Sequence, residues 1–78
     1  SKEERIGEIM KKARAVKMIM KQRNRIGLSS FSAAEKAGIN QSTWSRTERG
    51  ERDTSWEVLL MMARAVGLET NITIKRKD

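Results

Sequence analysis

Residues 34–50 read AEKAGINQSTWSRTERG, and the spacing of small and apolar residues in this stretch decides the fold. Ala34 is small, and Gly38 follows four positions later. The apolar Ile39 and the bulky Trp44 come next. Two short helices that cross at a tight turn need such residues, and glycine adopts a positive φ there without strain. The stretch therefore predicts a helix-turn-helix unit over residues 30–49, which indicates DNA binding.

Composition limits what the chain can be. It has 78 residues, near the lower size limit for one hydrophobic core, so we expect a single domain over residues 1–78 that gains stability by self-association. The sequence has no cysteine and no histidine, which excludes disulfides, thiolate nucleophiles, imidazole acid–base groups and the usual zinc sites. We expect no metal, no cofactor and no enzymatic activity.

The charge of the chain predicts a polyanionic partner. The formal net charge is +7, and basic surfaces gain affinity for phosphate backbones by releasing counterions. Residues 1–26 hold nine Lys and Arg against three Glu, whereas residues 27–78 hold eight basic and seven acidic residues. The helix-turn-helix unit itself is therefore nearly neutral.

A long amphipathic helix is expected over residues 3–25. Apolar residues recur there at steps of three and four, and Lys and Arg fill the other face. The helix is open to an interruption near Gly7 or between Ala15 and Lys17. The apolar positions are Ile6, Ile9, Met10, Ala13, Val16, Ile19 and Met20.

Membrane binding is the first rival interpretation, because this helix is basic and amphipathic. Its apolar face is expected to cover the helix-turn-helix unit, which leaves little for lipid. No apolar run approaches the roughly 18 residues of a membrane span, and the N-terminus lacks the apolar core of a signal peptide. We expect a cytoplasmic protein with no membrane contact.

Polar caps and glycines divide the rest of the chain into three further helices. Two belong to the helix-turn-helix unit, and a fourth helix is expected over residues 55–66. The candidate caps are Ser29 or Ser30 for the second helix, Asn40 or Gln41 for the third, and Thr54 or Ser55 for the fourth.

The last segment changes character. Residues 69–75 alternate apolar and polar side chains and are rich in β-branched residues, which predicts a strand. A single strand in a helical chain leaves its backbone groups unpaired. We therefore expect it to pair with the same strand of a second copy, through Thr70, Ile72 and Ile74.

Four short motifs together indicate the family of the chain. They are Arg23-x-x-x-Gly27-Leu28-Ser29, the run from Ala34 to Thr43, Ser45-Arg46-x-Glu48-Arg49-Gly50-Glu51-Arg52, and Ser55-Trp56-Glu57-Val58-Leu59. On these residues, over about positions 16–67, the sequence resembles the Xre/Cro type of lambda-repressor-like helix-turn-helix regulators. With the pattern above, the resemblance implies an all-α fold: a compact four-to-five-helix lambda-repressor-like DNA-binding domain. It has a long first helix and a C-terminal β-strand that pairs across a dimer.

In this family the N-terminal part of the third helix enters the major groove of double-stranded DNA. Glutamine pairs with adenine, arginine with guanine, and hydroxyls with bases or phosphates. Taken singly, Ser42 also suits a helix start and Arg46 a solvated charge. The resemblance places Gln41, Ser42, Thr43, Ser45 and Arg46 on the DNA, with Ser30, Asn40 and Arg49 at the flanks on phosphates.

The resemblance also implies structural roles. Glu48 is expected to be half-buried and paired with Arg23. Ala33 is smaller and Trp44 larger than the usual family residues, so we expect the two to compensate by volume in the core. Phe31 stands at a usually exposed position, where it either packs against the first helix, which we favour, or belongs to a patch for a protein partner.

The C-terminal segment favours one kind of regulator. The expected fourth helix is followed by Gly67-Leu68-Glu69 and then by the alternating strand. This order resembles the short antitoxins of the Hip and Hig toxin–antitoxin type. That resemblance implies a homodimeric, nucleoid-associated repressor of bacterial or phage origin that reads an inverted-repeat operator and holds a toxin protein. Two alternatives are a phage-type repressor without a toxin and a protein-interaction module whose DNA binding is secondary. The basic residues open to an acidic partner or flanking DNA are Lys11, Lys12, Arg14 and Lys17.

Overall fold

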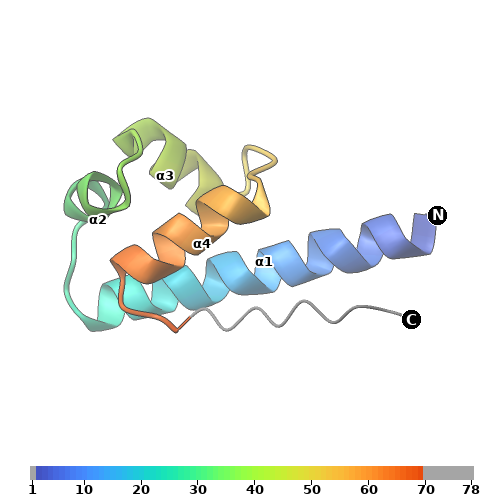
Figure 1. Cartoon of the computed structure of the whole chain (residues 1–78), viewed down its shortest axis with the longest axis horizontal. Helices are drawn as coiled ribbons and strands as arrows, with labels where there is room; N and C mark the ends of the chain where they lie inside the picture. Colours follow the sequence, from blue (N-terminus) through green and yellow to red (C-terminus); the bar gives the residue numbers. More distant parts are fainter. Residues whose placement is uncertain (1, 70–78) are drawn as a thin grey trace.

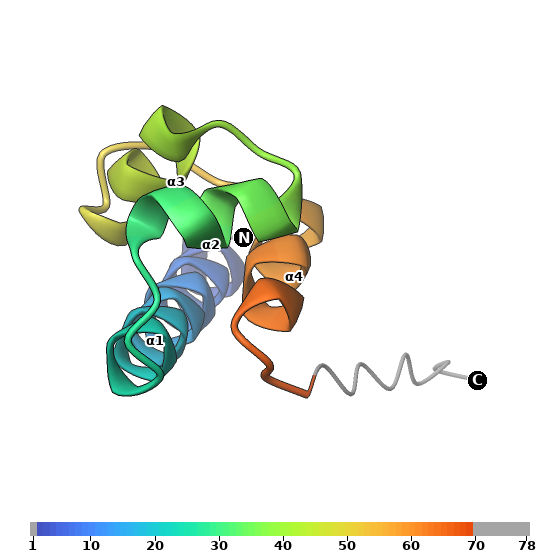
Figure 2. The same cartoon turned by 90° about the vertical axis from the view of Figure 1, so that its left-hand side faces the viewer.

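The computed structural model describes residues 2–69, which form four α-helices and no strand. Their bounds are α1 Lys2–Arg25, α2 Ser30–Ala37, α3 Gln41–Glu48 and α4 Trp56–Ala65. α1 runs along one side of the molecule, and the other helices pack over its C-terminal part (Figure 1). Viewed along α1, α2 and α3 lie on one side, above α1 and α4 (Figure 2). The expected all-α fold with a long first helix is confirmed.

α1 is continuous over its 24 residues, so neither of the two interruptions that the sequence left open occurs. Gly7 faces open space, and one glycine costs a helix only about 1 kcal/mol. Acidic residues lie in the first turn and basic residues in the last, where each sign is favoured by the helix dipole.

Serine hydroxyls cap two of the other helices. Ser29 Oγ accepts a hydrogen bond from Ser32 N–H at 3.1 Å, and Ser55 Oγ accepts one from Val58 N–H at 3.3 Å. Asn40 occupies the N-cap position of α3 without a side-chain cap hydrogen bond. Thr54 is not a cap, because its side chain turns into the interior.

The core lies where the C-terminal part of α1 meets the other three helices. Trp44 and Ala33 are both fully buried in it, and the expected volume compensation between them stays a prediction. Small alanines on α2 allow the bulky residues of α1, α3 and α4 to meet. The large fully buried side chains are Trp44, Ile19, Leu59, Met62 and Val66.

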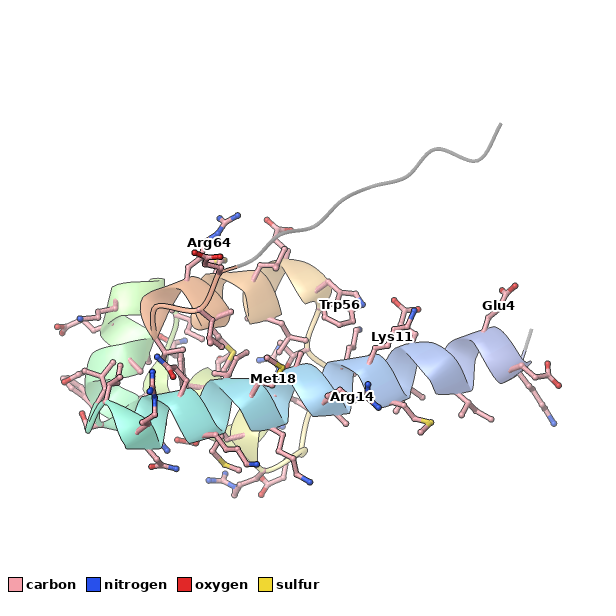
Figure 3. The ribbon with its side chains drawn as sticks, turned by 90° about the horizontal axis from the view of Figure 1, so that it is seen from below. Glu4, Lys11, Arg14, Met18, Trp56 and Arg64 are labelled. Atoms are coloured by element: carbon pink, nitrogen blue, oxygen red, sulfur yellow. The ribbon has the colours of Figure 1, made fainter. Side chains whose placement is uncertain are left out.

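The first turns of α1 extend beyond the other helices (Figure 1). We call residues 2–13 the α1 arm. The exposed fractions of Ile6, Ile9 and Met10 are 56%, 60% and 62%, so the expectation that the apolar face of α1 covers the helix-turn-helix unit is wrong for the arm. On another side of α1, Glu8 Oε1 accepts a hydrogen bond at 3.1 Å from Nε1 of Trp56, which leans from α4 toward α1 (Figure 3).

Phe31 is also exposed, at 60%, so the expectation that it packs against the first helix is wrong. α2 turns Ala33, Ala34 and Ala37 toward the core, and Phe31 lies on a different side of that short helix. Its other interpretation, as part of a patch for a protein partner, stays a prediction.

The expected C-terminal strand over residues 69–75, with Thr70, Ile72 and Ile74, lies outside the described residues except for Glu69. Glu69 belongs to no helix or strand. Strand pairing across a dimer therefore stays a prediction.

Candidate nucleic-acid interface

α2 and α3 are joined by the turn that the sequence predicts. Gly38 has a φ of 75°, a left-handed conformation that favours glycine. The N–H of Ile39 donates to the Ala34 carbonyl at 3.0 Å and closes the end of α2. Ala34 and Ala37 are buried, so α2 and α3 pack closely at this turn.

The predicted DNA residues lie on the outer side of this unit. α3 buries Trp44 and Thr47, and its opposite side therefore faces outward. A hydrogen bond of 3.4 Å from Gln41 Nε2 to Ser30 Oγ links the start of α3 to the start of α2. Asn40, Gln41, Ser42, Arg46 and Arg49 are exposed, whereas Ser30, Thr43 and Ser45 are half-buried.

Arg52 joins this surface, although it was not predicted as a DNA contact from the sequence. Its Nη1 donates to Thr43 Oγ1 at 3.3 Å, so the guanidinium lies beside α3. Arg46, Arg49 and Arg52 follow one another at three-residue spacing, and that spacing is the signal that could have identified Arg52. We call this surface the α3 face; it consists of Ser30, Asn40, Gln41, Ser42, Thr43, Ser45, Arg46, Arg49 and Arg52.

The carboxylate of Glu51 lies beside the α3 face. Glu51 accepts hydrogen bonds from Nε and Nη2 of Arg49, the second at 3.2 Å. The hydrogen bond from Arg49 lowers the pKa of Glu51, and the carboxylate in turn raises the pKa of Arg49. Both side chains are about half exposed, so a phosphate that approaches Arg49 meets an ionised carboxylate beside it.

Buried polar contacts anchor α3 to α1. Arg23 Nε and Nη2 donate to the two carboxylate oxygens of Glu48 at 2.7 and 3.0 Å, which confirms the expected pair. Arg23 Nη1 also donates to the Leu28 carbonyl at 2.9 Å. Trp44 Nε1 donates to Glu48 Oε2 at 2.9 Å, a contact that the volume argument missed. The hydrogen bond with Glu48 raises the pKa of Arg23 against the effect of burial.

A buried pair of hydroxyls ties the loop after α3 to the helix. Thr47 Oγ1 lies 2.8 Å from the Thr43 carbonyl and 2.7 Å from Thr54 Oγ1. A hydroxyl has one hydrogen, so Thr47 donates to the carbonyl and Thr54 donates to Thr47. This pair explains why a polar residue occupies a buried position in α3.

The α3 face presents guanidinium, amide and hydroxyl groups, which suit phosphates and base edges. Within residues 2–69 no group of acidic, histidine or cysteine side chains is placed to hold a metal ion. None of the helices in that part of the chain is long and apolar enough to cross a membrane.

Comparisons with known proteins identify the same unit. A helix-turn-helix domain family matches residues 12–71 of the sequence. The crystal structure of the restriction-modification controller protein C.AhdI from Aeromonas hydrophila is similar, with a TM-score of 0.66 and 28% identity, over 74% of this chain and 84% of C.AhdI. The search of curated protein sequences found no significant match. The two matches confirm the resemblance to Xre/Cro-type regulators, whereas the Hip and Hig resemblance stays a prediction.

Proposed function

Because this chain belongs to the helix-turn-helix domain family, we propose that it is a transcriptional regulator that binds specific DNA sequences through the α3 face. The observation that carries the proposal is the anchoring of α3. Its inner side is fixed by Glu48 and Thr47, while its outer side presents polar side chains to solvent. A rigid helix with a polar outer side can enter a major groove in one defined register.

Each group of the α3 face has a distinct task in this proposal. Arg46 is exposed on the outer side of α3, which suits a bidentate contact with guanine. Gln41, oriented by Ser30, reads adenine, and the hydroxyls of Ser42 and Ser45 contact bases or phosphates. The expected phosphate contacts are Ser30, Asn40, Arg49 and Arg52, because they lie at the edges of α3.

Two copies of the chain are needed to give strong specificity with so small a face. A twofold pair that places two α3 helices about 34 Å apart reads an inverted repeat with half-sites one helical turn apart. Where such an operator overlaps a promoter, the bound protein represses transcription from that promoter. The similarity to a controller protein supports this regulatory role. The antitoxin role rests mainly on residues outside the described part of the chain and stays a prediction.

Selection of random duplexes by the purified chain near physiological salt tests the proposal. We expect an inverted repeat with half-sites about ten base pairs apart. The matched variant is Arg46→Ala, which should cost about 1–3 kcal/mol and relax one base position in each half-site. Uniform weakening on all sequences would instead assign Arg46 to phosphate, and an unenriched wild-type pool would contradict the proposal.

A further inference from the structure

The α1 arm carries an apolar stripe that nothing in residues 2–69 covers. It consists of Ile6, Ile9, Met10 and Ala13, all exposed. Single apolar residues on a surface are normal, whereas several large ones side by side mark an interaction site. We call these four residues the arm stripe.

The spacing of the stripe is that of a helix-pairing seam. Positions 6, 9, 13, 16 and 20 are all apolar and follow one another at alternating steps of three and four, which is the pattern of the contact line between two paired helices. Ile9, Ala13, Val16 and Met20 also line one wall of a groove of about 1010 Å³, and the loop over residues 49–54 lines the other. The groove gives room for side chains of a second helix.

The charges along α1 favour a second copy of the same helix. In residues 2–8 three Glu outnumber two basic residues, whereas residues 9–25 carry basic charges only, so two α1 helices placed antiparallel bring segments of opposite net charge together. A parallel arrangement would set the two strongly basic segments side by side. The charged residues of the first turns are Lys2, Glu3, Glu4, Arg5 and Glu8, and the basic ones that follow in the arm and beyond it are Lys11, Lys12, Arg14, Lys17 and Lys21.

The same charges disfavour an anionic lipid surface as the occupant. Glu3 lies one turn before Ile6 on the same side of the helix, so the apolar end of the arm would carry a carboxylate toward negative headgroups. A second α1 placed antiparallel brings its basic segment to this carboxylate.

We propose that α1 pairs with α1 of a second copy of this chain, antiparallel, about a twofold axis between Ile9 and Met10. Ile6 of one copy then faces Ala13 of the other, and Glu3 comes near Lys17. The proposal rests on the proposed function in one respect, because a protein that reads an inverted repeat needs two copies. The pairing itself requires no DNA.

A measurement of molar mass in the absence of DNA tests whether the arm stripe pairs two copies of the chain. One chain has a mass of 8.9 kDa, and we expect the wild type to have twice that mass. Ile9→Glu buries two carboxylates at the axis and should raise the dissociation constant by about 100-fold or more. The matched control is Met18→Glu: Met18 is similarly exposed, at 55%, but lies on another side of α1, near Arg14 (Figure 3). This control should pair like the wild type, and circular dichroism should show both variants folded.

Three results would overturn the proposal: a wild type that stays monomeric at millimolar concentration, equal pairing by Ile9→Glu and the wild type, or dissociation by Met18→Glu alone. Loss of pairing in Ile74→Glu but not in Ile9→Glu would likewise overturn it and assign the pair to the expected C-terminal strand. DNA selection is a separate measurement. A chain that pairs through α1 but enriches no sequence contradicts the proposed function only.

Introduced cysteines test the orientation, because the chain has none of its own. In the antiparallel pair the two copies of position 6 lie about 10 Å apart along the helices, too far for a disulfide. Ile6→Cys alone should therefore not cross-link, whereas a mixture of Ile6→Cys and Ala13→Cys should. Cross-linking of Ile6→Cys alone would show a parallel pair and overturn the arrangement.

Discussion

The two ends of α1 share one pattern of apolar residues and have opposite surroundings. At the C-terminal end Ile19 is 2% exposed and Arg23 holds Glu48, so the helix is part of the core. In the arm, Ile9 is 60% exposed, although both isoleucines belong to the same periodic pattern in the sequence. Periodicity therefore predicts that one side of a helix is apolar, and only the rest of the fold decides whether that side is covered.

The largest expected effect is at the anchor of the C-terminal end. Glu48→Ala leaves Arg23 half-buried without its carboxylate and Trp44 Nε1 without an acceptor, which should cost about 3–5 kcal/mol of unfolding free energy. Urea denaturation of the free protein measures the loss. Glu51→Ala is the control, because Glu51 is about half exposed and pairs only at the surface. Equal losses in the two variants would mean that Glu48 is no anchor.

The second prediction compares the two isoleucines directly. Ile19→Ala removes a fully buried side chain and should cost about 2–4 kcal/mol, whereas Ile9→Ala should change stability by less than about 0.5 kcal/mol. Both are measured by denaturation at protein concentrations low enough for the chain to be monomeric, because pairing through the arm would add to apparent stability. A large loss in monomeric Ile9→Ala would mean that the arm is covered by its own chain.

Ile9 and Ile19 also show which features of the fold could be predicted from the sequence and which could not. The turn at Gly38, the long first helix and the Arg23–Glu48 pair could be predicted, because local spacing and a family resemblance specify them. The exposure of the arm could not, since it depends on how far α4 and the loop over residues 49–54 extend along α1. The Trp44 contact was missed because volume alone was considered, and Arg52 because it lies after the helix.

The buried hydroxyls give a smaller, third effect. Thr47→Val leaves the Thr54 hydroxyl buried without its acceptor, and Thr54→Val removes one donor, so each should cost about 1–3 kcal/mol. The double variant removes both groups and should cost less than the sum of the two. Thermal denaturation of the wild type, the two single variants and the double variant measures the interaction free energy between the two hydroxyls. Additive losses would show that the two hydroxyls do not act as a pair.

The smallest effect is expected on the α3 face itself, where a surface ion pair replaces the buried anchor. Glu51→Gln removes the carboxylate beside Arg49, so the guanidinium can neutralise a phosphate fully. Affinity for any duplex should rise by about two- to fivefold, and the slope of log affinity against log salt should steepen by up to about 0.9. Because Arg49 lowers the pKa of Glu51, the wild type should keep its weaker binding down to a pH below the ordinary range of a glutamate and approach the variant only in stronger acid. Titration of a labelled non-operator duplex at several salt concentrations measures both quantities. Unchanged affinity and slope would mean that Arg49 stays paired with Glu51 and lies off the DNA.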